Sequence, residues 1–75
     1  MTKINKGIEA EKVEKAFNIN KSKLTPRERD VLSRYYGLSP EVRHSLAEIG
    51  RLYSVTRERI RQIKVSGLSK IGVKN

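Results

Sequence analysis

The chain has 75 residues and no cysteine, so it is long enough for one small domain and excludes a disulfide framework, a thiolate metal site and a cysteine nucleophile. Its single histidine gives metal binding no support, and the sequence predicts neither a metal nor a cofactor. Seventeen lysine and arginine residues against eight aspartate and glutamate residues give a formal net charge of +9, which favours a polyanionic partner. Nucleic acid is the first candidate and an anionic membrane surface is the second.

The sequence carries no sign of membrane insertion or export. No apolar run approaches the roughly 18 residues that cross a bilayer, and the first residues are polar and rich in lysine, unlike a signal peptide. We therefore expect a cytoplasmic chain with no membrane partner and no small-molecule substrate.

Positive charge is concentrated in the carboxy-terminal part of the chain. Residues 1–42 carry nine basic and six acidic side chains, a net charge of +3, whereas residues 43–75 carry eight basic and two acidic ones, a net charge of +6. This asymmetry predicts that the second half contacts the polyanion.

The amino-terminal segment, residues 1–23, is predicted to hold one short amphipathic helix between about residues 9 and 17, because Val13, Ala16 and Phe17 fall on one helical face. The polar residues before it are expected to fray. Residues 18–23 are rich in turn formers and are predicted to connect this helix to the next.

A second helix is predicted to begin at Pro26, because Thr25 and Glu28 form a capping box and proline suits the first helical position. Gly37 is expected to end this helix with a left-handed cap. Residues 38–44, which include Pro40, are predicted to form a loop.

Ser45 and Glu48 repeat the capping pattern and predict a helix of about two turns, with apolar positions at Leu46, Ile49, Leu52 and Tyr53. After a break at residues 54–55, Thr56 is predicted to cap a final helix. One face of that helix is formed by Ile60, Ile63, Gly67 and Ile71. The predicted fold is a small all-α domain of three to four helices, in which residues 24–75 carry a carboxy-terminal helix-turn-helix.

A helix-turn-helix makes packing demands that the sequence meets. Gly50 supplies the small residue where the two helices cross closely, and Val55 supplies the buried aliphatic of the turn. Ser54 departs from the pattern, because many such turns use glycine there and a positive φ would cost a serine about 1 kcal/mol.

The outward-facing side chains of the last helix determine which partner this helix can contact. At 100° per residue, Glu58, Arg61 and Gln62 lie at about 100°, 40° and 140° from Arg57, so the four side chains share one face near the amino-terminal end. Arginine can bind guanine, glutamate can accept from cytosine and glutamine suits adenine. Such a charged cluster is usually only a solvated face, but the helix-turn-helix around it favours base recognition. We expect the four side chains to be unburied and not engaged with one another.

Several other residues admit two interpretations. The tyrosines could stack on bases, although their helical spacing beside aliphatic residues favours packing for Tyr35 and Tyr53. His44 lies in a polar loop and is expected to be solvated. Four arginines could equally bind phosphate or keep the domain soluble: Arg27, Arg29, Arg34 and Arg51.

Four segments closely resemble region 4 of bacterial primary sigma factors of the sigma-70 family: LTPRERDVL, YYGL, SLAEIGRL and VTRERIRQIK, between about Leu24 and Ile71. This resemblance implies that the last helix reads the upstream promoter hexamer in double-stranded DNA while another surface contacts the β flap of RNA polymerase. By position it implies base-reading roles for Arg57, Glu58 and Gln62. It implies phosphate or activator contacts for Arg59 and Arg61, and DNA-strand contacts for Leu46 and Thr56. The flap-facing surface would involve the helix at residues 26–36 and the loop after it.

The sequence departs from the family at Lys64, where many relatives have glutamate, and at Ser66 and Ser69, where basic residues are common. Gly67 replaces the usual alanine, which should cost the helix up to about 1 kcal/mol. Residues before Leu24 follow the family only loosely.

Three functional alternatives remain at this point. The first is a promoter reader that contacts polymerase. The second is a regulator, encoded by a phage or mobile element, that occupies the region 4 site on polymerase with DNA contact secondary. An enzyme is poorly supported, because no acid and base pair stands at a sensible spacing and no glycine-rich phosphate loop is present. The chain could be a fragment of a longer factor or a free-standing protein, and its unrelated amino-terminal segment favours the latter weakly.

Overall fold

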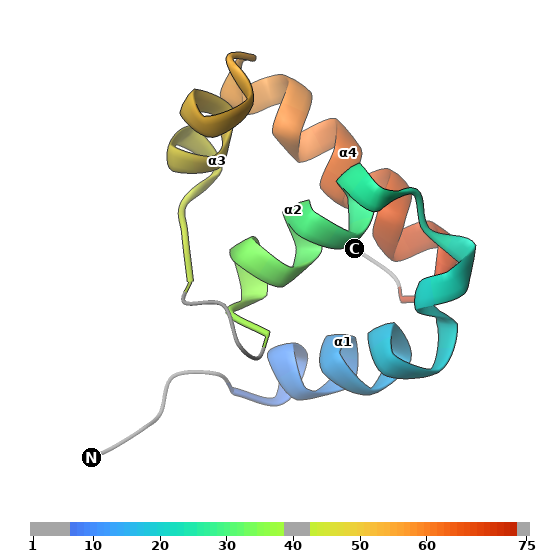
Figure 1. Ribbon diagram of the computed structural model, residues 1–75. Coiled ribbons are helices and arrows are strands. Elements are labelled where there is room, and N and C mark those ends of the chain that lie inside the picture. Colours follow the sequence, from blue (N-terminus) through green and yellow to red (C-terminus); the bar gives the residue numbers. More distant parts are fainter. Residues whose placement is uncertain (1–6, 39–42, 74–75) are drawn as a thin grey trace.

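The computed structural model describes residues 7–38 and 43–73, and this part of the chain is helical without any strand (Figure 1). The all-α prediction is confirmed. The elements in chain order are α1 (Gly7–Asn20), the 3-10 helix η1 (Lys21–Lys23), α2 (Pro26–Tyr36), α3 (Leu46–Tyr53) and α4 (Arg57–Lys70).

The first helix is longer than predicted. Residues 18–20, expected to be part of a connector, extend α1, and the chain then tightens into η1. The Nδ2 atom of Asn20 donates to the carbonyl oxygen of Ala16 at 3.2 Å, which satisfies one of the acceptors left open at a helix end. Residues 7–9 are helical rather than frayed, and residues 1–6 lie outside the described part of the chain.

The starts of α2 and α3 are fixed by the two predicted capping boxes. Thr25 Oγ1 accepts from the amide of Glu28 at 3.1 Å, and Glu28 Oε1 accepts from the amide of Thr25 at 2.9 Å. Ser45 and Glu48 make the same pair of bonds at 3.1 and 2.8 Å. Gly37 ends α2 with φ of 65°, as predicted. The predicted loop at residues 38–44 lies partly outside the described residues, which resume at 43.

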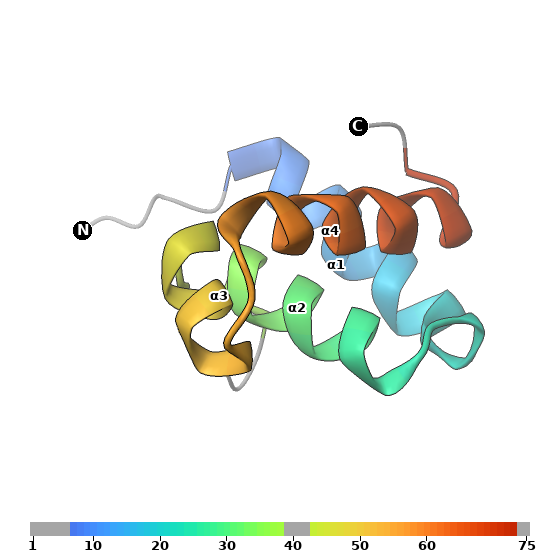
Figure 2. The ribbon, with the colours of Figure 1, turned by 90° about the horizontal axis from the view of Figure 1, so that it is seen from above.

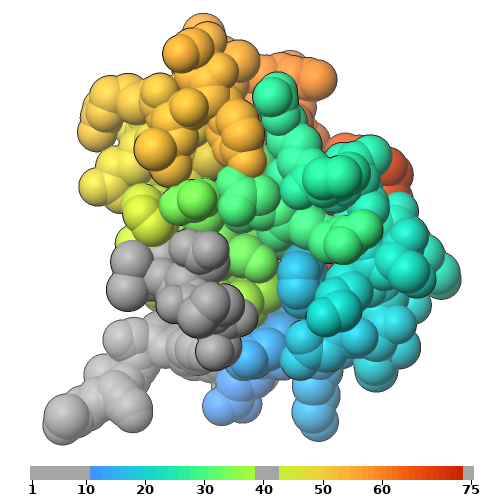
Figure 3. Space-filling model, in the orientation of Figure 1, coloured from blue at the N-terminus to red at the C-terminus, as the bar shows by residue number. Residues whose placement is uncertain are grey.

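Two groups of buried side chains form the core. In the first, α1 packs against α2 and the end of α4, through Val13, Phe17, Leu24, Leu32, Tyr36, Leu38, Leu68 and Ile71. The second lies under α3 and the start of α4, and consists of Val31, Ile49, Ile60 and Ile63. Viewed as in Figures 1 and 3, α3 and the start of α4 form one end of the molecule and α1 forms the other. The packing of α4 on both α2 and α3 therefore fixes the direction in which its amino-terminal end points (Figure 2).

Two side chains, Leu52 and His44, differ in burial from what the sequence predicts. Leu52 is 58% exposed, because it falls at the margin of the apolar face of α3 defined by Leu46, Ile49 and Tyr53. His44 was expected to be solvated but is half-buried, and its Nδ1 atom is buried without a hydrogen-bond partner within the described structure.

Candidate nucleic-acid interface

The turn between α3 and α4 brings the two helices into close contact. A Cβ atom added to Gly50 would lie 2.7 Å from the carbonyl oxygen of Val55, so only glycine fits without a shift. Ser54 caps α3 with φ of 59°, and the amide of Val55 donates to the Gly50 carbonyl at 2.9 Å. Val55 itself is half-buried against the second core group. The predicted role of Gly50 is confirmed. Val55, predicted to be buried, is half-buried, and Ser54 has the positive φ that many such turns give to glycine.

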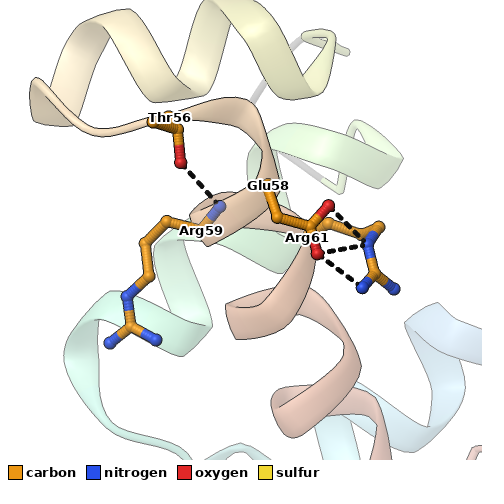
Figure 4. Close-up of polar contacts among 4 residues, drawn as sticks. All are labelled: Thr56, Glu58, Arg59 and Arg61. Atoms are coloured by element: carbon orange, nitrogen blue, oxygen red, sulfur yellow. Dashed lines mark hydrogen bonds and ion pairs between the residues drawn. The ribbon is translucent and has the colours of Figure 1, made fainter.

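The helix α4 is one continuous rod that starts at the predicted residue. Thr56 Oγ1 accepts from the amide of Arg59 at 3.1 Å and caps the amino-terminal end (Figure 4). Ile60 and Ile63, with 0% and 6% exposure, anchor the same turns to the core. One side of α4 is therefore packed against the core, and the opposite side is exposed to solvent.

The four side chains predicted to face outward, Arg57, Glu58, Arg61 and Gln62, are all exposed. The expectation that they would not engage one another is wrong for two of them. The Nη2 atom of Arg61 lies 2.7 Å from Oε2 of Glu58, and the Arg61 Nε donates to Oε1 at 3.1 Å (Figure 4). The three-residue spacing on a helix places these side chains beside each other. Arg59, by contrast, extends on the other side of α4 (Figure 4).

The pairing stabilises the charge on both partners. The hydrogen bond from Arg61 lowers the pKa of Glu58 below its ordinary value, and the bond to Glu58 raises the pKa of Arg61. Both side chains remain about half exposed, at 58% and 49%. Exposed ion pairs contribute little to folding stability, so this pair matters for the orientation of the two side chains rather than for the stability of the fold.

A shallow hollow of about 430 Å³ lies beside the start of α4. It brings together Leu46 and Arg57, two residues singled out by the sequence, with Tyr35, Arg43, His44 and Ser45. The sequence analysis did not select Arg43, whose only local signal is its basic charge just ahead of the cap of α3. Arg43 donates from Nε to the carbonyl oxygen of Tyr35 at 3.4 Å. Two guanidinium groups thus border the hollow next to the amino-terminal end of α3.

Two of the arginines that admitted two interpretations have intramolecular partners. Arg34 donates from Nε to Asp30 at 2.9 Å, and the guanidinium of Arg27 lies 4.5 Å from the ring centroid of Tyr53. Tyr53 donates its hydroxyl to Asp30, and burial together with this bond raises the pKa of Tyr53 to about 12. These contacts give Arg27 and Arg34 structural roles at the α2–α3 junction.

The tyrosines pack rather than present their faces as a stacking platform. Tyr36 is 4% exposed, and Tyr35 and Tyr53 are half-buried against the core. The ring centroids of Tyr35 and Tyr36 lie 4.9 Å apart in an edge-to-face arrangement. The ammonium of Lys64, one of the departures from the family pattern, lies 4.9 Å from the Tyr35 ring centroid. Packing, the favoured interpretation of Tyr35 and Tyr53, is confirmed.

Within residues 7–38 and 43–73, no group of histidine, cysteine, aspartate or glutamate side chains is arranged to hold a metal ion. Over the same residues, no helix has the length and apolar character that crossing a membrane requires.

The chain is similar to bacterial sigma factors. It is 56% identical over 50 residues to the RNA polymerase sigma factor SigA1 of Synechococcus elongatus, a match that covers 67% of this chain and 12% of the relative. To SigA of Nostoc sp. it is 44% identical over 68 residues, which cover 91% of this chain and 16% of the relative. To RpoD of Neisseria gonorrhoeae it is 50% identical over 48 residues, which cover 64% of this chain and 8% of the relative. The chain thus spans a small fraction of each of these relatives. No solved structure matches the chain significantly.

The family match coincides with the elements that build the helix-turn-helix. Residues 22–71 match the family described as "Sigma-70, region 4", close to the bounds predicted from the sequence. This family consists of sigma-factor domains, which agrees with the prediction that the chain is not an enzyme. The division at residue 24 between two segments stays a prediction. The chain belongs to the sigma-70 region 4 family.

Proposed function

We propose that this chain binds the upstream, or −35, element of bacterial promoters by placing the amino-terminal half of α4 in the major groove, while it contacts the β flap of RNA polymerase. The observation that carries the proposal is the arrangement of α4 itself. Its capped end at Thr56 is exposed and basic, and the same turns are anchored from behind by Ile60 and Ile63. A family of sigma-factor domains makes promoter DNA the expected polyanion, and the cytoplasm the expected location.

In this proposal Arg57, Glu58 and Gln62 contact base edges. Arginine suits guanine O6 and N7, glutamate suits cytosine N4, and glutamine suits adenine. All three side chains are exposed on one face of α4 and lie within its first two turns. This position supports the proposal, because it is the amino-terminal residues of a recognition helix that meet the bases.

Contacts with the DNA backbone are assigned to residues around this face. Leu46 and Thr56 lie at the starts of α3 and α4, where free amide groups and the helix dipole favour phosphate. Arg59 flanks the helix on its other side and is exposed. Arg43 borders the same hollow as Leu46, and because of this position we also assign it to the backbone contacts. Arg61 is assigned to the backbone or to activators by resemblance alone.

The contact with polymerase is assigned to α2 and the loop that follows it. The curated relatives carry the words "RNA polymerase sigma factor" in their names, and the match to them includes α2. Part of the following loop, residues 39–42, lies outside the described structure.

The direct test is binding of the full chain to a DNA duplex that contains a −35 element and to a duplex of equal length in which that element is scrambled. We expect tighter binding to the first at every salt concentration, because base contacts persist when phosphate contacts are screened. Equal affinity for both duplexes across the salt range would contradict sequence-specific recognition.

A second candidate function is a polymerase-binding regulator for which DNA contact is secondary. One observation favours it: Glu58 and Arg61, two of the four outward groups, neutralise each other. The two candidates are separated by pull-down of the β flap with the wild-type chain and with Arg57→Ala and Glu58→Ala variants. Flap binding that survives both changes, with no measurable DNA affinity in the wild type, would support the regulator and exclude the promoter reader.

A further inference from the structure

The side chains of Glu58 and Arg61 form the most extensive polar contact on the outward face of α4 among the described residues. Three hydrogen bonds join them, from Arg61 Nε to Oε1 at 3.1 Å and to Oε2 at 3.2 Å, and from Nη2 to Oε2 at 2.7 Å. Figure 4 shows the guanidinium nitrogens of Arg61 directed at the carboxylate oxygens of Glu58, while Arg59 extends away from both. The contact lies entirely within one helix and needs no other element to form.

We propose that Arg61 is a positioning residue that holds the Glu58 carboxylate in the orientation from which it selects a base. This inference rests on the proposed function and deepens it. It gives Arg61 a role in specificity, whereas resemblance to the family implies a contact with phosphate or with an activator.

The geometry leaves Glu58 able to act while it is held. A carboxylate has about four lone-pair sites on its two oxygens. Oε2 accepts two bonds from Arg61, but Oε1 accepts only one, so Oε1 keeps a site for an amino group such as cytosine N4. A glutamate side chain left alone on an exposed helix samples several rotamers, and ordering it on binding reduces affinity. The three hydrogen bonds to the planar fork of Arg61 restrict that freedom before DNA is bound.

The pairing with Arg61 also reduces the electrostatic repulsion expected between the Glu58 carboxylate and DNA. A carboxylate on a surface that approaches DNA phosphates is repelled by them. Arg61 sits within 2.7 Å of this carboxylate and makes the pair neutral as a unit. The same neutrality means that Arg61 adds little net positive charge toward phosphates, so its removal should act mainly through Glu58.

The test compares four variants with the wild-type chain: Arg61→Ala, Arg61→Lys, Glu58→Ala and the double variant Glu58→Ala/Arg61→Ala. Arg59→Ala is the matched control, because it removes the same charge from a neighbouring exposed position that is not bonded to Glu58. Binding is measured to a set of duplexes in which each base pair of the −35 element is changed in turn, at several salt concentrations. The three substituted positions, Glu58, Arg59 and Arg61, are all exposed, and circular dichroism checks that each variant is folded.

We expect Arg61→Ala to reduce discrimination at the base pair that Glu58→Ala also relaxes, by about tenfold if the base contact is a good one. The double variant should discriminate no worse than either single variant, because both changes remove the same contact. Arg61→Lys should fall between wild type and Arg61→Ala, since lysine keeps the charge but not the fork. Arg59→Ala should weaken binding to all duplexes alike.

The opposite pattern would overturn the inference. If Arg61→Ala keeps full discrimination at that base pair and instead lowers the slope of log affinity against log salt by about 0.9, Arg61 is a phosphate ligand. Failure of the proposed function looks different, because the wild-type chain itself would then show no preference among the duplexes.

Discussion

Ser54 adopts a backbone conformation that favours glycine. Its φ of 59° turns the chain so that the amide of Val55 donates back to the carbonyl oxygen of Gly50, and so ends α3 where α4 must begin. A residue with a Cβ atom pays about 1 kcal/mol for this conformation. The strain sits in the turn that orients α4, and it is the one place among the described residues where a non-glycine residue has positive φ.

We predict that Ser54→Gly raises the free energy of unfolding by about 0.5 to 1 kcal/mol, because relief of the strained φ exceeds the added entropy of the unfolded chain. Urea denaturation followed by circular dichroism measures the change. Ser69→Gly is the matched control: this serine is exposed inside α4, where glycine should lower stability. Destabilisation by both changes would show that Ser54 is not strained.

At the scale of elements, Glu28 links the start of α2 to the end of α4. Its carboxylate accepts from the amide of Thr25 at 2.9 Å, from the hydroxyl of Ser66 at 3.1 Å and from the ammonium of Lys70 at 2.9 Å. The residue is 7% exposed. Burial alone would raise the pKa of Glu28, but the three hydrogen bonds outweigh it, and the pKa lies below the ordinary 4.5. The charged form is therefore the one that stabilises the fold.

Replacing Glu28 by glutamine should lower the free energy of unfolding at neutral pH by about 1 to 3 kcal/mol, because an amide can accept from fewer of these donors. The carboxylate stabilises fully above its unfolded pKa, and its contribution is lost as the pH falls through the lower folded pKa. The difference between wild type and Glu28→Gln should thus be constant at neutral pH and shrink below pH 4.5.

Denaturation at a series of pH values measures this difference. Glu11→Gln, an exposed change of the same charge in α1, should alter stability by less than about 0.5 kcal/mol. A Glu28→Gln deficit that persists unchanged well below pH 4.5 would show that the carboxylate charge contributes nothing.

The elements differ in how far the sequence could predict them. The starts of α2, α3 and α4 follow from capping side chains within three residues of each helix start, so local sequence was sufficient. The end of α1 was not predicted, because asparagine and serine favour turns and helix ends alike, and the bond from Asn20 to Ala16 that accompanies the longer helix is not visible in the sequence.

The sequence predicted which residues of α4 form the candidate site, but not the contacts that these residues make. Which residues of α4 face outward follows from helical periodicity. The pairing of Glu58 with Arg61 was missed, although the spacing that permits it is visible in the sequence. The hollow that joins Arg43 to Arg57 depends on how α3 packs beside α4, and the bond from Ser66 to Glu28 spans 38 positions. Periodicity and capping carry no information about such tertiary contacts.

At the scale of the whole molecule, the proposed binding mode implies that basic side chains near the start of α4 set the strength of DNA binding through phosphate contacts, whereas a few base-reading side chains set its selectivity. Each phosphate neutralised by a lysine or arginine should contribute about 0.9 to the slope of log affinity against log salt. Basic side chains on the exposed surface of α1, such as Lys12 and Lys15, lie on the helix at the opposite end of the molecule from the start of α4 (Figure 1) and should then contribute to neither slope nor selectivity.

The distinction between binding strength and base selectivity predicts different effects for different substitutions on α4. Arg57→Ala should cost about 1 to 3 kcal/mol on the duplex that carries its cognate base and less on duplexes changed at that base, because the bidentate contact is lost only where it existed.

Glu58→Ala should relax the preference at one base pair with little loss of overall affinity, since removing a negative charge compensates for the lost contact. Lys12→Ala on α1 serves as the control for a lost positive charge and should leave both quantities unchanged. Titrations of the three variants against matched and singly changed duplexes measure these effects. If both α4 variants instead bind every duplex more weakly by the same factor, Arg57 and Glu58 face the backbone, and α4 lies across the groove rather than within it.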